Sequence, residues 1–157
     1  MGWSDQLRGR ETKHADADME LILPGRWRAS RESDHLSFVK EAEQLTVAAF
    51  HAKDPLDMPT LLVAVLELVR ARQDAMRELS GTELRLSEIQ TEYVAGGMNV
   101  SYTATDPSHA VQVYSVTIGR PTRVVTFTYN NSSSPLSPEP VFVARGQALQ
   151  AGLRVHP

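Results

Sequence analysis

An alternation of apolar and polar residues runs through the second half of the chain and predicts a series of β-strands. In segment 98–105 every second residue from Met98 to Ala104 is apolar, and the residues between them are Asn, Ser or Thr. Segment 125–129 repeats this pattern with Val125, Phe127 and Tyr129. Strand side chains point alternately to two faces, so both segments are predicted to be half-buried strands.

Two further segments complete this part of the pattern. Segment 111–118 is rich in β-branched and aromatic residues, but its alternation slips near Val113 and Tyr114. Either a β-bulge or burial of both faces in a central strand accounts for the slip. Segment 84–94 predicts a fourth strand, the least regular of the set.

Turn residues separate these segments. Gly96-Gly97 suits a tight hairpin, and 106–108 and 119–122 contain the Asp, Pro and Gly typical of turns. Connections this short join antiparallel neighbours, because a parallel crossover needs about a dozen residues or more. Segment 84–129 is therefore predicted to be a four-stranded antiparallel meander around which the chain is organised.

The first half predicts strands followed by a long helix. Segment 19–23 is an apolar strand ended by Pro24-Gly25, and segments 36–39 and 44–50 read as two strands, with one long bent strand as the alternative. Segment 57–80 predicts a helix, with Asp57 as N-cap and Gly81 as C-cap. Its apolar stripe, which predicts packing across a sheet, comprises Leu62, Val65, Leu66, Val69, Met76 and Leu79, widened by Leu61 and Leu68.

A second helix is predicted after the polar loop 130–137. Ser137 suits its N-cap and Pro138 its first position. Its buried stripe runs from Val141 to Leu153, with small residues that favour close packing on the sheet. Residues 1–18 show no periodicity and are predicted to be a flexible tail.

The predicted fold class is therefore α+β. It is a β-β-β-α-β-β-β-β-α sandwich in which a mainly antiparallel twisted sheet packs against a long central helix and a C-terminal helix. At 157 residues, the chain suits a single domain, here 19–157 after the tail.

Composition narrows the function classes. The chain has no cysteine, so disulfides, thiolate metal sites and thiol nucleophiles are excluded. The formal net charge is −3 with charges of both signs interspersed, which argues against nucleic acid as a partner. No apolar run reaches the roughly 18 residues of a membrane span, and the N-terminus lacks the apolar core of a secretory signal. A cytoplasmic location is the resulting expectation.

The element order, together with MELILPGRW at 19–27 and RVVTFTYNN at 123–131, resembles the PsbP-like α/β sandwich superfamily over about residues 19–155. That group includes the extrinsic subunit of photosystem II, a Ran-binding import factor and bacterial chaperones of type VI secretion effectors. The resemblance rests on element order and on the Pro-Gly-x-Trp hinge at Pro24, Gly25 and Trp27. It implies a non-enzymatic binding role and carries over no functional residue.

Residues of catalytic or metal-binding type form no recognisable motif. The five histidines are not at metal-ligand spacing, and there is no HExxH or GxSxG motif. A triad formed only in space would leave no sequence signal. No cofactor, no metal and no catalytic residue is expected. Trp27 is interpreted as an anchor that closes one end of the core, with ligand stacking as the alternative.

The tyrosines are the candidate partner-binding residues. One lies on each predicted meander strand: Tyr93, Tyr102, Tyr114 and Tyr129. On a shared open face they would make an aromatic surface of the kind enriched in interfaces. The alternative is that they pack under the helices with their hydroxyls reaching the rim.

The sequence thus favours a non-enzymatic protein-binding module, with a cytoplasmic adaptor or chaperone linked to bacterial secretion as its specific form. A protein partner is expected, a homodimer is one arrangement left open, and neither nucleic acid binding nor membrane insertion is expected. The competing class is a small-molecule binder or enzyme that uses a cleft between the sheet and the long helix.

Overall fold

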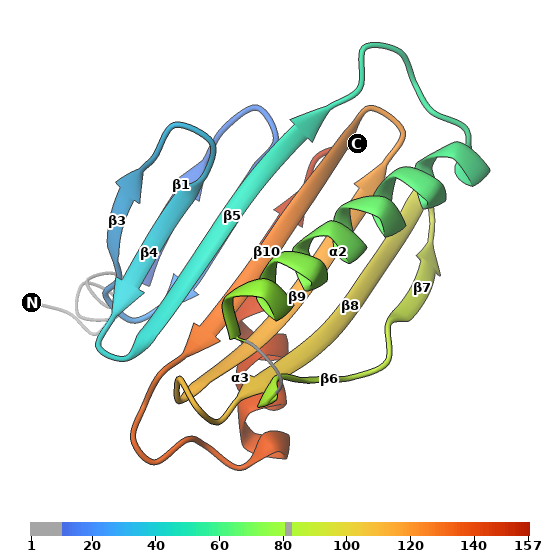
Figure 1. Cartoon of the computed structure of the whole chain (residues 1–157). Helices are drawn as coiled ribbons and strands as arrows, with labels where there is room; N and C mark the ends of the chain where they lie inside the picture. Colours follow the sequence, from blue (N-terminus) through green and yellow to red (C-terminus); the bar gives the residue numbers. More distant parts are fainter. Residues whose placement is uncertain (1–10, 81–82) are drawn as a thin grey trace, which may run out of the picture.

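A long antiparallel sheet forms the centre of the structure. The computed structural model describes residues 11–80 and 83–157, and within them one sheet has eight strands and a second has three. The large sheet runs in the order β3-β4-β5-β10-β9-β8-β6, with β7 also paired to β8 (Figure 1). Its strands are β3 Arg28–Arg31, β4 Leu36–Lys40, β5 Glu43–His51, β6 Arg85–Leu86, β7 Gln90–Val94, β8 Gly97–Asp106, β9 Val111–Arg120 and β10 Arg123–Asn131.

The two faces of this sheet are covered by different layers. Helix α2, Met58–Ser80, packs on one face against β8 and β9. The other face carries helix α3, Glu139–Gln150, and the small sheet. The small sheet has the order β1-β2-β11. Its strands are β1 Glu11–Ala15, β2 Met19–Pro24 and β11 Leu153–Val155.

The predicted meander is confirmed with one difference. Strands β7, β8, β9 and β10 pair antiparallel in succession, as the turn lengths require. The predicted first strand, 84–94, is split into β6 and β7. Between the pairs Leu86–Ala104 and Gln90–Ser101, three residues of this segment face two of β8, so the pairing register shifts by one residue. At the shift, the Ser87 hydroxyl accepts a hydrogen bond from the Thr103 N–H at 2.8 Å.

Strand β9 explains the slipped alternation. It pairs without a break with β8 on one side and β10 on the other, so it contains no bulge. Six consecutive residues from Tyr114 to Gly119 are buried, as expected for a central strand covered on both faces. The N-terminal segments 36–39 and 44–50 are two strands, joined by a tight turn in which Glu41 has a φ of 53°.

Helix α2 begins as the sequence predicts. The Asp57 carboxylate accepts a hydrogen bond from the Thr60 N–H at 2.8 Å, which confirms the N-cap. Leu61, Val65 and Val69 are fully buried against the sheet. Leu79, predicted to be in the buried stripe, is 83% exposed, and the last buried residue of α2 is Gln73. The predicted C-cap Gly81 lies outside the described residues.

Helix α3 is shorter than predicted at both ends. It begins at Glu139 after Pro138, and no side chain caps it, so Ser137 is not the N-cap. The Ser137 carbonyl instead accepts a hydrogen bond from the Gln112 side chain at 2.7 Å. Leu153 is not helical but pairs with Leu21 in the small sheet, because backbone pairing with β2 replaces the next helical turn.

The predicted tail is wrong for residues 11–15. They form β1, whose five residues pair with β2, while residues 1–10 lie outside the description. The Thr12 hydroxyl accepts a bond from the Trp27 N–H at 2.8 Å and donates to the Gly25 carbonyl at 3.0 Å. Trp27 is 6% exposed, in agreement with its interpretation as an anchor, and its indole N–H donates to the Pro24 carbonyl. The hinge motif is thus stabilised by a hydrogen bond within it and by hydrogen bonds to Thr12 of β1.

Candidate functional site

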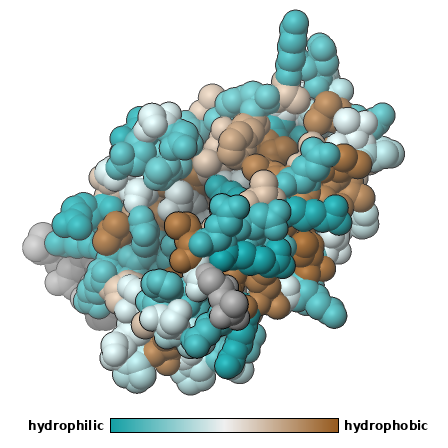
Figure 2. Space-filling model, viewed as in Figure 1, coloured by the Kyte–Doolittle hydropathy of each residue, from teal (hydrophilic) through white to brown (hydrophobic). Residues whose placement is uncertain are grey.

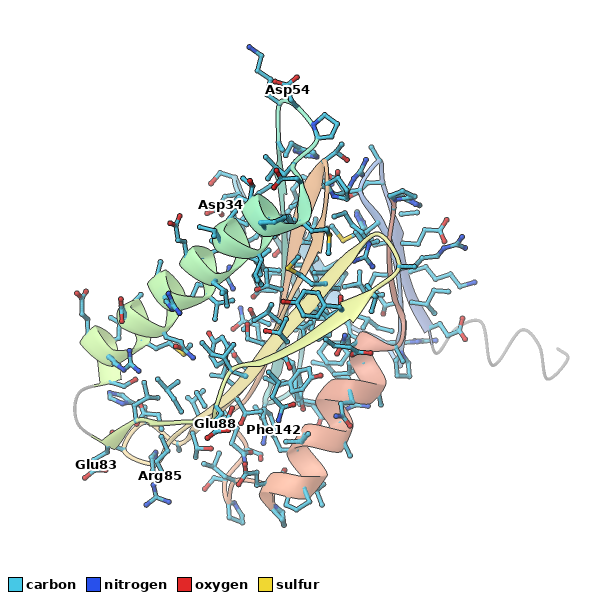
Figure 3. The ribbon with its side chains drawn as sticks, turned by 90° about the vertical axis from the view of Figure 1, so that its right-hand side faces the viewer. Asp34, Asp54, Glu83, Arg85, Glu88 and Phe142 are labelled. Atoms are coloured by element: carbon cyan, nitrogen blue, oxygen red, sulfur yellow. The ribbon has the colours of Figure 1, made fainter. Side chains whose placement is uncertain are left out.

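A row of adjoining hollows lies between strand β8 and helix α3. It consists of adjoining hollows, one of about 340 Å³ and two of about 210 Å³, which share lining residues. We call this the β8–α3 groove. Figure 3 shows Glu88 on the side of the sheet that carries α3, and Arg85 farther along. Its lining includes Arg85, Ser87, Glu88, Gln90, Glu92, Asn99, Ser101, Thr103, Thr105, Tyr114, Glu139, Val143, Gln147 and Gln150.

The groove follows from the alternation in β8 and from where α3 packs. The apolar side chains of Met98, Val100 and Tyr102 lie under α2. The alternate residues, Asn99 to Thr105, therefore point to the opposite face. Helix α3 covers that face mainly over β9 and β10. The polar side chains of β8 therefore form the floor of the groove, and α3 lies beside them without covering them.

The lining is polar and carries more negative than positive charge. Glu88, Glu92 and Glu139 contribute carboxylates, and Arg85 contributes the guanidinium at one end. The Asn99 side-chain oxygen is buried and has no hydrogen-bond partner. A buried acceptor without a donor is costly, so a ligand that offers N–H or O–H groups would satisfy it.

The tyrosines do not form one open surface, so that prediction is wrong. Tyr102 is 4% exposed and packs under α2, whereas Tyr114 and Tyr129 are buried in the core on the opposite face. The register explains the split, because Tyr114 lies opposite Thr103 in β8, one residue from Tyr102. Only Tyr93 of the four is well exposed, at 63%.

The buried tyrosine hydroxyls are used inside the protein. Tyr114 donates to the Gln150 side chain at 2.7 Å, and Tyr129 donates to Glu43. Burial raises the pKa of Tyr102 and of Tyr114. Burial and the Glu43 carboxylate together raise the pKa of Tyr129 strongly. All three phenols therefore stay protonated at neutral pH.

Serine, histidine and aspartate side chains meet in the turn between β8 and β9. The His109 Nδ1 lies 2.7 Å from the Asp106 carboxylate and 3.2 Å from the Ser108 hydroxyl. In a catalytic triad the serine contacts one ring nitrogen and the carboxylate the other. Here both meet the same nitrogen, so the imidazole ring cannot relay a proton from the serine to the carboxylate. The Ser108 hydroxyl donates to Asp106 at 2.7 Å, which makes the cluster a turn-stabilising network.

A second cluster of charged groups lies where β1 and β2 meet the β3–β4 hairpin. Asp16, Asp18, Glu32 and Asp34 line a hollow of about 210 Å³. Asp18 is paired with His51 at 2.6 Å and with Arg123 at 3.0 Å. The carboxylates are thus already engaged. Within residues 11–80 and 83–157, no three His, Asp or Glu side chains are arranged to hold a metal ion.

The space between α2 and β8 is filled by Leu61, Val65 and Val69 against Met98, Val100 and Tyr102. At these residues side chains occupy the space where a cleft beside the long helix was predicted. Figure 2 shows hydrophilic residues interspersed with smaller hydrophobic areas on the α2 side of the molecule. The groove described here lies beside the short helix α3.

Solved structures share this arrangement. Cyanobacterial PsbP (CyanoP) from Synechocystis sp. PCC 6803 superposes with a TM-score of 0.69 at 11% sequence identity, over 94% of each chain. The chain has a PsbP-like fold. The Ran-binding protein Mog1p of Saccharomyces cerevisiae matches with a TM-score of 0.56 at 12% identity, over 92% of this chain and 95% of that one.

The PsbP-like fold is thereby established by shape alone. No protein-family model matches the sequence, and no curated protein matches it significantly. At such low identity the fold carries no residue role from one protein to the other. Among the described residues, no helix is long and apolar enough to cross a membrane.

Proposed function

We propose that this protein is a non-enzymatic protein-binding module that holds an extended segment of a partner polypeptide in the β8–α3 groove. The observation that carries the proposal is the row of adjoining polar hollows along one strand. The floor from Asn99 to Thr105 spans about 20 Å at the usual rise per strand residue. That length suits an elongated chain of about six residues.

The chemistry of the lining supports a peptide. Side-chain amides and hydroxyls, such as those of Gln90, Ser101 and Gln147, can both donate to and accept from a backbone. The side-chain oxygen of Asn99 has no hydrogen-bond partner, and the backbone N–H of any non-proline residue of a bound peptide could donate to it. The Ser108–His109–Asp106 geometry supports a role without catalysis at that cluster.

The comparisons support the same direction. Mog1p, which shares the fold, is named as a Ran-binding protein. The sequence resemblance adds the more specific proposal of a cytoplasmic adaptor or chaperone linked to bacterial secretion. Microscopy of the tagged protein in its host and the identity of its captured partner test that specific form.

A small-molecule binder is the second candidate. The hollow of about 340 Å³ lined by Arg85, Gln112 and Glu139 favours it, because ligand pockets begin at roughly this size. Native mass spectrometry of the purified protein separates the candidates. A retained metabolite that occupies the groove would contradict the peptide proposal.

Site-specific photocrosslinking tests the peptide proposal directly. A photoreactive side chain at Gln147, which is exposed beside the groove, should crosslink a partner protein in cells. Ser101→Trp fills the middle of the groove and should abolish that crosslink. The matched control Val63→Trp, at an exposed position of α2, should leave it intact. An equal crosslink in all three forms would contradict the proposal.

A further inference from the structure

Strand β7 forms an open edge of the large sheet beside the groove. In the described part of the chain it pairs with β8 alone, and Figure 1 shows it at the outer border of the sheet. Four of its five residues are exposed. Alternate N–H and C=O groups of an edge strand point away from the sheet, and they are complementary to the backbone of another extended chain.

The two faces of β7 differ in chemistry. Residues directly opposite in an antiparallel pair point to the same face. Tyr93 lies opposite Met98, so it faces the α2 side, where the sheet is apolar. Glu92 lies opposite Asn99, so it faces the groove. A strand added at this edge would have one row of side chains near Tyr93 and the alternate row near Glu92.

The opposite end of the sheet is protected in a way that β7 is not. Strand β3 has Arg28 and Arg31 at its two ends, and charges on an edge strand discourage pairing with another chain. Strand β7 has the sequence Gln-Thr-Glu-Tyr-Val, with one charge and no proline or lysine. Thr, Tyr and Val are favourable strand residues. Of these two edges, β7 is therefore the one whose residues favour pairing with an added strand.

We infer that the β7 edge binds an extended segment of a different polypeptide by β-strand addition, and that this segment alternates basic with apolar residues. Basic side chains would lie on the groove side near Glu92 and Glu88, and apolar ones beside Tyr93. The inference deepens the proposed function, on which it rests. It adds backbone pairing at β7 to the groove and names the chemistry of the partner.

A second copy of this chain fits the edge less well. The antiparallel two-fold arrangement that pairs all five residues of β7 places Glu92 opposite the Glu92 of the partner copy. Like charges directly opposite each other destabilise a strand pair. Charge complementarity therefore favours a basic segment from another protein over a homodimer at this edge.

Defined peptides test the inference. The probes are capped peptides of about nine residues, in which lysine alternates with valine or glutamate alternates with valine, a length that spans β7. Binding is followed by NMR titration and amide hydrogen exchange. The lysine peptide should bind and slow exchange within 90–94. Of two lysine peptides N-methylated on alternate sets of amides, one should lose binding, because methylation blocks its pairing edge.

Charge reversal provides the matched variants. Glu92→Lys should weaken the lysine peptide about fivefold and strengthen the glutamate peptide, as expected for one cross-strand charge pair. Glu67→Lys, at an exposed position of α2, should change neither affinity. An unchanged preference in the Glu92→Lys protein would overturn the inference.

The remaining outcomes separate this inference from the proposed function. If Ser101→Trp abolishes peptide binding and the peptide does not slow amide exchange within 90–94, the peptide lies in the groove alone. That result would contradict this inference but not the proposed function. If no peptide binds and no partner is crosslinked from position 147, both this inference and the proposed function are contradicted. Self-association with protection within 90–94 would identify a second copy as the occupant and overturn the basic partner.

Discussion

Arg145 on α3 grips the carboxylate of Glu43 on β5 with two hydrogen bonds of 3.0 and 3.1 Å, from its Nε and Nη2. These residues are 102 positions apart in the sequence. The Tyr129 hydroxyl donates to the same carboxylate, and the guanidinium lies 6.0 Å from the Trp27 ring. One ion pair thus joins the helix, the large sheet and the hinge motif.

Arg145→Ala is expected to destabilise the protein by about 2 kcal/mol, because it removes charge-assisted hydrogen bonds and leaves Glu43 partly buried without its partner. Urea unfolding measures the loss. Arg77→Ala breaks an exposed pair with Asp74 and should cost less than about 0.5 kcal/mol. Arg145→Lys should recover only part of the loss, since lysine cannot form the fork. Equal losses for Arg145→Ala and Arg77→Ala would contradict the structural role.

The same carboxylate makes stability depend on pH. Burial by itself raises the pKa of Glu43, but hydrogen bonds from Arg145 and Tyr129 outweigh it and hold the pKa below the ordinary value of 4.5. A lowered folded-state pKa stabilises the protein at pH values above 4.5, and this stabilisation is lost as the pH falls through the folded pKa. Unfolding free energies measured from about pH 6 down to about pH 3 should fall less steeply in Glu43→Gln. Parallel pH profiles would refute the assignment.

Gly146 allows α3 to lie on the Tyr114 ring. A Cβ at this position would stand 2.6 Å from the Tyr114 Cγ, far inside contact distance. Gly146→Ala should therefore destabilise by about 1 kcal/mol net, although alanine is the better helix former. Thermal unfolding of the double variant with Tyr114→Leu should show a smaller added cost than the two single changes together. Additive losses would mean that the ring is not the obstacle.

The loss of stability on replacing a tyrosine with alanine should depend on how deeply that tyrosine is buried. Tyr102→Ala removes a buried ring under α2 and should cost about 3–5 kcal/mol, as large aromatic truncations in cores do. Tyr93→Ala, at a 63% exposed position, should change stability by no more than about 0.5 kcal/mol. Chemical unfolding compares the two. A large loss in Tyr93→Ala would show that this ring packs on the fold.

Strand β1 should contribute to stability although the sequence pattern gives no sign of it. A chain that starts at residue 19 should melt roughly 5–10 °C below one that starts at residue 11, because it loses the pairing with β2 and the Thr12 bonds to the hinge. Thr12→Val should lower the melting temperature, and Thr12→Ser, which keeps the hydroxyl, should not. Equal melting temperatures for the two truncated chains would show that β1 is dispensable.

Periodicity predicted the elements that bury one face. Met98 to Ala104 alternate strictly, and Asp57 caps the long helix, so these elements are visible locally. Strands β3 and β11 escaped prediction for a physical reason. The first is exposed throughout and the second has three residues, so neither carries an apolar pattern long enough to read.

The candidate groove could be predicted only in part. The polar residues of its floor stand in the sequence as the second row of the β8 alternation. Helix α3 lies over β9 and β10 and leaves this row open. This position depends on the close packing of Gly146 on the Tyr114 ring. The tyrosines fall one to a meander strand, yet the register sends Tyr102 and Tyr114 to opposite faces, because a shift of one residue reverses the side.

The sequence by itself determined the fold class, the meander and the long helix, because side-chain periodicity and turn residues act over a few neighbouring positions. Only the tertiary structure decided where the polar row of β8 stays open, which edge remains unpaired and that Glu43 meets Arg145. Those features depend on strand register and on the seating of α3, which are fixed by contacts between residues far apart in the chain.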